Sequence, residues 1–247
     1  MKNIGIIGAG PIGSTLGRKL SALGYSVKIA NSRGADSLAV LAAEINADAV
    51  DLRAAVVDVD LVIISIPQKS IENLPHDLFV GCKESLIVVD TGNYYPLRDG
   101  RIDEVDNGKV ESQWVAEHIR MPVLKAFNSI QAASLADKGK PAGDPDRIAL
   151  PVSGDDMNNK MDLIQLIDAL GFDGVDGGTI AESWRQQPGS PVYCTDHNRK
   201  DVLRFLQLAD KSSLAALRNK GLQLVMQAKD PMKEACEILR GLYDHIS

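Results

Sequence analysis

The residues best suited to chemistry lie within the first 33 positions of the chain. A turn with the spacing G-x-G-x-x-G, Gly8-Ala9-Gly10-Pro11-Ile12-Gly13, follows the apolar run 3–7. Gly8 permits a tight turn, Gly10 lets a pyrophosphate approach the backbone, and Gly13 allows a helix to pack closely on a strand. Pro11 suits the first turn of that helix, whose N-terminal N–H groups and dipole attract anions. The pattern predicts a dinucleotide-binding turn.

The residues that follow the second strand indicate which dinucleotide the turn would bind. A second strand-like run, 25–30, ends at Asn31-Ser32-Arg33, and the first acidic residue after it is Asp36. NAD-specific proteins place an acid at the end of this strand to bind the ribose 2′-hydroxyl. A guanidinium, a hydroxyl and an amide instead suit a 2′-phosphate, which attracts positive charge and hydrogen-bond donors. We therefore expect NADP(H), the alternative being a solvated loop with a surface arginine.

Further turns follow other strand-like runs. Ser65-Ile66-Pro67 closes the run that starts at residue 61, Asn93 ends the turn after 85–89, and Asn128-Ser129-Ile130 follows 123–127. In an open parallel sheet, ligands bind beyond the carboxyl ends of the strands. We assign Ser65, Ile66, Pro67 and Asn93 to the cofactor site, and Asn128, Ser129 and Ile130 to a substrate pocket. Ordinary turn chemistry is the alternative for these residues.

Alternating strand and helix patterns must position these turns. Strands are expected at 3–7, 25–30, 61–66, 85–89, 123–127, 147–152 and 173–175, and helices at 35–45, 112–119 and 157–170. The alternation predicts an α/β protein with a doubly wound, mostly parallel Rossmann sheet extended by extra strands. A cluster of Gln, Pro and Gly at 186–191 precedes three helical patterns, 200–209, 212–227 and 231–246. We expect an NADP-binding domain over 1–183 and a helical C-terminal segment over 184–247.

Composition excludes several classes of protein. The chain is 45% hydrophobic and 24% charged, and its net charge of −6 argues against nucleic acid or an anionic membrane as partner. No run approaches the 18 or so apolar residues of a membrane-spanning helix. Three widely spaced cysteines indicate a reducing compartment rather than a disulfide framework. We expect a cytoplasmic protein with a small-molecule redox substrate.

No catalytic residue can be assigned from sequence. The four histidines are scattered, and Cys194 with His197 lacks the second pair of ligands typical of a metal site, so no metal is predicted. Nucleophile-elbow, Walker and H-E-x-x-H motifs are absent. Hydride transfer to a flavin-like ring needs orientation and water exclusion rather than an acid/base pair. Tyr94 and Tyr95 keep an alcohol-dehydrogenase variant open, because ketone reduction needs a proton donor.

Several blocks occur in an order that resembles a known family. They are Gly8–Gly13, Asn31-Ser32-Arg33, Ser65-Ile66-Pro67, Lys125-Ala126-Phe127-Asn128, Leu150–Asp156 and Asp176-Gly177-Gly178. Residues 1–185 are similar to NADP-dependent oxidoreductases that work with the deazaflavin coenzyme F420, and to the cytosolic domain of the six-transmembrane metalloreductases. The resemblance implies that the glycine turn holds the pyrophosphate and that Ser32 and Arg33 hold the 2′-phosphate. It also implies that Ser65-Ile66-Pro67 lines the ribose and nicotinamide.

Two departures from the family pattern bear on function. Ala9 stands where deazaflavin-using members often carry a threonine that also touches the 2′-phosphate, so NADP affinity would depend more on Arg33. Asn128-Ser129-Ile130 is closer to the metalloreductase version. The resemblance implies a hydride transfer between NADP(H) and a deazaflavin, flavin or similar electron acceptor. The alternative is a non-catalytic NADP(H)-binding redox sensor.

The C-terminal helical patterns carry apolar stripes that must be buried. One stripe contains Leu214, Leu217, Leu222, Leu224 and Val225, and the other contains Ala235, Ile238, Leu239, Leu242 and Ile246. The stripes could cover the chain's own sheet or a second subunit. Related small NADP oxidoreductases are commonly dimers, so we expect a homodimer.

Overall fold

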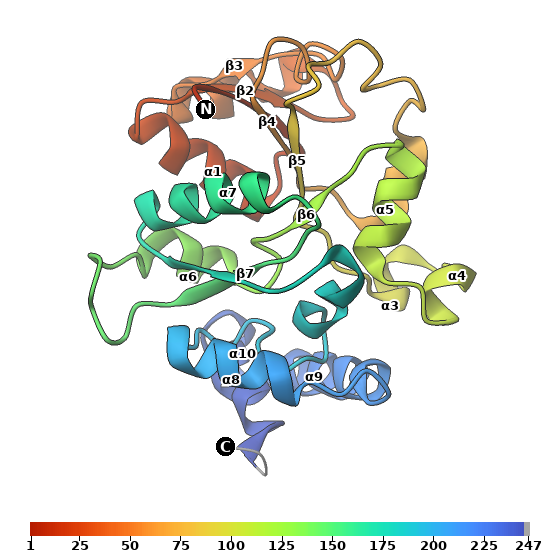
Figure 1. Cartoon of the computed structure of the whole chain (residues 1–247), viewed down its shortest axis with the longest axis vertical. Coiled ribbons are helices and arrows are strands. Elements are labelled where there is room, and N and C mark those ends of the chain that lie inside the picture. The colour runs from red at the N-terminus through yellow and green to blue at the C-terminus, as the bar shows by residue number, and fades with distance from the viewer. Residues whose placement is uncertain (245–247) are drawn as a thin grey trace. The chain divides into compact units, whose positions relative to one another are not determined.

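The computed structural model describes residues 1–244, which form two compact units divided between Lys125 and Ala126. The first unit is built on a six-stranded parallel sheet in the order β3-β2-β1-β4-β5-β6 (Figure 1). Its strands are β1 (Asn3–Ile7), β2 (Ser26–Ala30), β3 (Asp48–Ala49), β4 (Leu61–Ile64), β5 (Ile87–Asp90) and β6 (Leu124–Lys125). This order confirms the predicted doubly wound α/β class.

The sequence of the first unit explains its elements. Strands β4 and β5 are buried along their whole length, as expected where helices cover both faces of a parallel sheet. Helix α1 (Pro11–Ala22) buries Leu16 and Leu20, four residues apart on one face. The remaining helices are η1 (Ala35–Leu38), α2 (Ala39–Ile45), η2 (Gln68–Asn73), α3 (Pro96–Asp99), α4 (Asp103–Asp106) and α5 (Glu111–Ile119).

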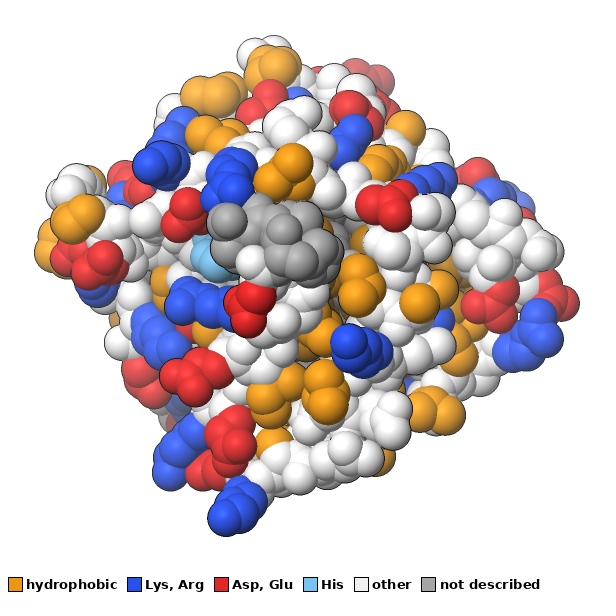
Figure 2. Space-filling view, turned by 90° about the horizontal axis from the view of Figure 1, so that it is seen from below, with side chains coloured by type: hydrophobic (Ala, Val, Ile, Leu, Met, Phe, Trp, Pro, Cys, Tyr) orange, Lys and Arg blue, Asp and Glu red, His pale blue; other side chains and the backbone are white. Residues whose placement is uncertain are grey.

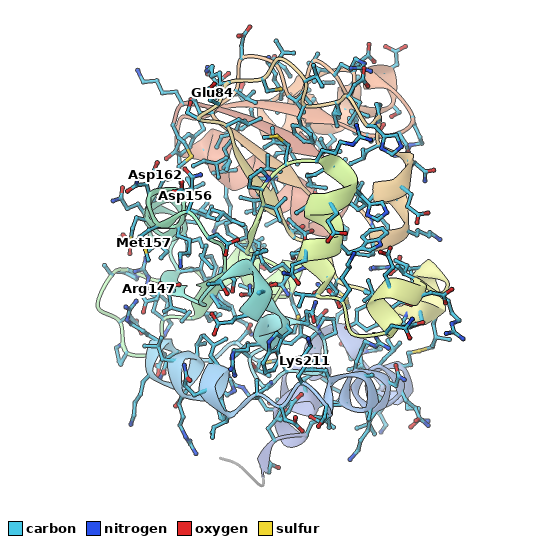
Figure 3. The ribbon with its side chains drawn as sticks, turned by 45° about the vertical axis from the view of Figure 1, so that its right-hand side comes forward. Glu84, Arg147, Asp156, Met157, Asp162 and Lys211 are labelled. Atoms are coloured by element: carbon cyan, nitrogen blue, oxygen red, sulfur yellow. The ribbon has the colours of Figure 1, made fainter. Side chains whose placement is uncertain are left out.

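The second unit contains a separate sheet of two parallel strands, β7 (Ala149–Val152) and β8 (Asp173–Asp176). These strands were expected to extend the Rossmann sheet, but they pair with each other instead. They lie between α7 (Met157–Ala169) and α8 (Arg199–Leu208) (Figure 1). Asp156, which is labelled in Figure 3 next to Met157, caps α7 by accepting a 2.9 Å hydrogen bond from the N–H of Asn159.

The expected division at residues 183/184 falls inside the second unit. The Gln, Pro and Gly cluster after η3 (Ile180–Gln186) is buried, and Gln186 is fully enclosed. Its side-chain amide donates to Asn128 and to the carbonyl of Pro151, and its oxygen accepts from Ser153. A segment with the composition of a linker belongs to the core here, and the side chain of Gln186 finds buried partners there.

The predicted C-terminal helices are present as α8, α9 (Leu214–Gln227) and α10 (Pro231–Gly241), and α6 (Ala132–Asp137) completes the second unit. Val202, Phe205 and Leu206 of α8 pack into one cluster with residues of β7 and β8. Helices α9 and α10 pack against each other. The expected last helix reached Ile246, and Ile246 and His245 lie outside the described residues. Within residues 1–244, no helix is both long and apolar enough to cross a membrane.

Gly189 supplies a test of the packing in the second unit. Its φ is +92°, and a Cβ built there would lie 2.1 Å from the carbonyl oxygen of Leu214 and 2.8 Å from the N of Arg218, both on α9. Gly189→Ala is therefore expected to lower the free energy of unfolding by about 3 kcal/mol or more, because backbone strain adds to a backbone clash.

Gly24→Ala is the matched control for this substitution. Gly24 has a φ of +87° but no atom within 4 Å of a built Cβ, so its cost is the left-handed backbone alone, about 1–2 kcal/mol. Urea unfolding of both variants measures the difference. Equal losses would show that α9 does not pack against Gly189.

Candidate functional site

A cavity of about 470 Å³ lies at the carboxyl ends of β1, β2 and β4 in the first unit. It brings together the three turns that the sequence singled out around the glycine motif. Their lining residues are Gly8, Ala9, Gly10, Asn31, Ser32, Arg33, Ser65, Ile66 and Pro67. Four further lining residues, Leu52, Ser70, Asn73 and Leu74, come from segments with no recognisable motif, so sequence alone did not indicate them.

The glycines of the turn have different roles in this geometry. Gly8 has a φ of +112°, and a Cβ there would lie 2.1 Å from the carbonyl oxygen of Ser65. A Cβ on Gly13 would lie 2.0 Å from the carbonyl oxygen of Gly8. Gly10, in contrast, has no atom within 4 Å of its built Cβ. Gly8 and Gly13 are therefore required by packing within the protein, whereas Gly10 leaves open space beside the cavity for an approaching group.

The start of α1 lies beside the cavity, at Gly10. Gly10 is the N-cap, no side chain caps the helix, and the first turn contains no acidic residue. Pro11, Ile12 and Gly13 form that first turn and are not among the residues that line the cavity. The N–H groups of a first helical turn lack partners within the helix, and the dipole favours negative charge there. The residues present therefore fit a pyrophosphate.

In the turn after β2, one side chain holds the backbone and two others face the cavity. The side-chain oxygen of Asn31 accepts a 2.8 Å hydrogen bond from the N–H of Arg33, and its amide nitrogen donates to Ser37. Asn31 therefore shapes the turn. Ser32 and Arg33 are exposed at the cavity, and no carboxylate among residues 1–244 pairs with Arg33. An uncompensated guanidinium next to a hydroxyl fits a phosphate group.

Tyr94 and Tyr95, which follow β5, were considered as proton donors for the reduction of a ketone. Tyr94 is fully buried, and its hydroxyl donates to Asp106 over 3.1 Å and accepts from the N–H of Ile102 over 3.0 Å. Its hydroxyl is thus engaged in holding the segment that follows β5. Tyr95 is half-buried and lies beside the Arg98 guanidinium. Asn93, which was assigned to the cofactor site, does not line the cavity.

Asn128, Ser129 and Ile130 lie in the second unit and are all buried. The Asn128 amide donates to the carbonyl of Gln186 over 2.7 Å, and its oxygen accepts from the Gln186 amide over 2.9 Å. The carbonyl of Ser129 accepts from the N–H of Cys194. These contacts hold the turn after β6 to the segment after η3. A substrate-pocket role for the three residues stays a prediction.

A second cavity, of about 870 Å³, lies in the second unit and is lined mainly by charged residues. Its cations already have partners: Lys138 pairs with Asp196 at 2.9 Å, Lys140 pairs with Asp144 at 3.0 Å, and Arg240 donates to two backbone carbonyls. This cavity is larger than the first, but its lysine and arginine side chains are already bound within the protein. Size alone therefore does not identify the functional site.

The Cys194 and His197 pair does not form a metal site in the structure. Burial raises the pKa of the Cys194 thiol to about 12, which disfavours the thiolate that a metal needs. Burial and then the nearby Arg240 charge lower the pKa of His197, whose ring packs against Phe205. Among residues 1–244 no group of three or more His, Cys, Asp or Glu side chains is placed to hold a metal ion.

Comparison with known proteins agrees with the geometry of the first unit. A sequence model of the family described as NADP oxidoreductase, coenzyme F420-dependent, matches residues 3–94. The solved structure of a hypothetical protein from Sinorhizobium meliloti is 34% identical, with a TM-score of 0.63, over 74% of this chain and 88% of that one. The chain belongs to the F420-dependent NADP oxidoreductase family.

Two other relatives extend the comparison. A candidate F420-dependent NADP reductase from Arthrobacter sp. FB24 has the same fold, with a TM-score of 0.60 at 21% identity over 74% of this chain and 87% of that one. The protein YjhV of Escherichia coli K12 is 44% identical over 92 residues, which are 37% of this chain and 60% of YjhV. The chain thus matches less than two thirds of the length of this curated relative. The family match supports NADP-linked oxidoreduction, as the motifs predicted.

Proposed function

We propose that the chain binds NADP(H) in the cavity of the first unit and transfers a hydride between it and a deazaflavin, flavin or similar acceptor. One observation carries the proposal: the glycine turn, Arg33 and the Ser65-Ile66-Pro67 turn line one cavity, with no acid at the end of β2. The three turns are the parts that a dinucleotide with a 2′-phosphate requires.

The cavity suggests a place for each part of the dinucleotide. The pyrophosphate would lie over Gly10 at the start of α1, and the 2′-phosphate at Ser32 and Arg33. Asn31 would hold the turn that presents these two side chains. Ile66 and Pro67 would give the nicotinamide half an apolar wall that excludes water. Bound NADPH would itself supply the hydride, so the protein's task is orientation.

The same geometry favours a flavin-like acceptor over a ketone. Reduction of a ketone needs a positioned proton donor, whereas a hydride can pass to a flavin-type ring without one. Tyr94, one of the two tyrosines considered for that role, is buried with its hydroxyl engaged by Asp106. No catalytic side chain is assigned.

Arg33→Ala tests the cofactor preference. The substitution is expected to weaken NADP⁺ binding by about 1.5–3 kcal/mol, the scale of a hydrogen bond to a charged group, and to leave the weak NAD⁺ binding nearly unchanged. Calorimetry measures both affinities. Arg18→Ala, an exposed arginine on α1 paired with Glu44 at 3.8 Å, is the matched control and should change neither. A wild-type preference for NAD⁺ would refute the proposal.

The enzyme and the redox sensor predict different behaviour with acceptors. We expect the wild-type chain to oxidise NADPH with at least one acceptor from a panel of deazaflavin, flavins and ferric chelates. The loss of NADPH absorbance measures this oxidation. The Arg33→Ala chain should need more NADPH for half-maximal rate. Tight NADPH binding with no turnover across the panel would favour the sensor.

We also propose that α8–α10 form the interface of a homodimer. Of the residues of α9, only Gly221 is buried. Large apolar side chains are exposed on these helices, and hydrophobic side chains are visible among charges on the face of the molecule shown in Figure 2. The exposed residues are Leu203, Leu208, Leu224, Met226 and Met232. We base the interface on the weak burial of α9 within the chain, because the apolar side chains of an amphipathic helix are normally buried against a partner.

Light scattering tests the dimer. The expected mass is about twice the 26.6 kDa of one chain, and Met226→Lys should shift it toward one chain because a charge would enter an apolar interface. Met226 is 70% exposed in the single chain, so its replacement does not disturb the fold. Met157→Lys on α7, at a residue 55% exposed, is the control and should remain dimeric. A wild-type mass of one chain would exclude the interface.

A further inference from the structure

A buried ion pair lies below the turn that follows β5. The Lys125 ammonium, at the end of β6, donates to Asp90 Oδ2 over 3.0 Å and to the carbonyl oxygen of Gly92 over 2.6 Å. Both charged side chains are enclosed, with 0% and 1% of their surface exposed. A buried lysine has lost its hydration, and close charged and hydrogen-bonding partners must offset that loss.

The same two side chains hold both sides of the turn at Gly92. Asp90 Oδ1 accepts a 2.8 Å hydrogen bond from the N–H of Gly92, while Lys125 binds its carbonyl oxygen. Asp90 Oδ2 also accepts a 2.7 Å hydrogen bond from the Ser112 hydroxyl. The next carbonyl, that of Asn93, accepts from Arg98. Side chains therefore set the conformation of the turn at residues 91–93.

Gln68 joins this turn to the cavity. It directly follows Pro67, is fully buried, and donates to the carbonyl of Glu111 over 3.2 Å. A Cβ on Gly92 would lie 2.8 Å from Asp90 Oδ1 and 3.0 Å from Gln68 Oε1. The turn after β4 and the turn after β5 are therefore in close packing contact, and a shift at Gly92 would displace Gln68 and the adjoining Pro67.

The turns after β4 and β5 lie where the nicotinamide half of a bound dinucleotide is expected. The 2′-phosphate site lies at the end of β2 and the pyrophosphate site at the end of β1, so a dinucleotide crossing the sheet carries its nicotinamide half over β4 and β5. The turns at 65–68 and 91–93 follow those two strands. The geometry of the nicotinamide half thus depends on what holds these turns.

We propose that Lys125 is a positioning residue for the nicotinamide half of the dinucleotide, acting through the Gly92 peptide and Gln68. The inference rests on the proposed function, since it presumes NADP(H) in the cavity. Lys125 is enclosed and acts without touching the cofactor. A neutral side chain in its place leaves the Gly92 carbonyl and the Asp90 carboxylate without their cation, and the turn then loses its single conformation.

The test compares two ligands that share the adenosine half. NADP⁺ contains the nicotinamide half, whereas 2′,5′-ADP lacks it. Lys125→Met is expected to weaken NADP⁺ binding about tenfold or more and to change 2′,5′-ADP binding less than about twofold, since the loss of one hydrogen bond or an equivalent contact to the nicotinamide half weakens affinity by about this factor. The fluorescence of bound NADPH, which reports the surroundings of the nicotinamide, should also move toward that of free NADPH. Lys125→Arg, which keeps the charge, should recover part of both signals.

Two further variants keep the test decisive. If Lys125→Met does not fold because the buried carboxylates of Asp90 and of Glu111, which lies 3.8 Å from the Lys125 ammonium, are left without a cation, a second variant removes all three charges. Lys125→Met with Asp90→Asn and Glu111→Gln should give the same ligand-selective loss. Lys160→Met is the control: Lys160 is also a buried lysine, paired with Asp176 at 2.8 Å in the second unit. It should lower the melting temperature without changing the ratio of the two affinities.

The outcomes separate this inference from the proposed function. Equal losses for NADP⁺ and 2′,5′-ADP in a folded Lys125 variant, or no loss for either, would overturn the positioning role. A wild-type chain that binds neither ligand would instead refute NADP(H) binding itself.

Discussion

The candidate site depends on the close approach of the glycine turn to the end of β4. Gly8 lies so near the carbonyl of Ser65 that a single added carbon would clash with it, and Gly13 lies equally near Gly8. This contact places the start of α1 beside the Ser65-Ile66-Pro67 turn. The cavity exists because these two backbone segments meet without side chains between them.

Charge is used in two opposite ways in the first unit. Arg33 is exposed, and no carboxylate of the described residues pairs with it, so its charge is available to a ligand. Lys125 is enclosed and bound to Asp90 and to the Gly92 carbonyl, so its charge organises the backbone. The difference follows from burial: an exposed cation keeps its hydration until a ligand replaces it, whereas a buried one must be matched within the fold. Lysine and arginine side chains therefore cannot be given roles from residue type alone.

The second unit contains a network of buried polar side chains beside its apolar core. Gln186, Asn128 and Ser153 form a connected set of hydrogen bonds in an enclosed region, and Tyr243 from the end of the described chain reaches the carbonyl of Gly189. These polar groups bind one another and nearby backbone carbonyls, because an unpaired buried amide is costly. The segment containing Gln186 is consequently part of the core, although its Pro and Gly content is typical of a linker.

The sequence by itself determined the elements and the motif. The G-x-G-x-x-G spacing, the run of buried strands and the Asn31-Ser32-Arg33 turn predicted the doubly wound sheet and the turns that lie around its cavity. These signals are local, because each depends on residues a few positions apart. Only the tertiary structure decided which strands pair, so that β7 and β8 form their own sheet, and which polar residues are enclosed. Asn128, Tyr94 and Lys125 have no local signal for burial, because their partners lie 58, 12 and 35 residues away in the chain. Long-range packing fixed their roles, and it also brought Leu52 and Asn73 to the cavity.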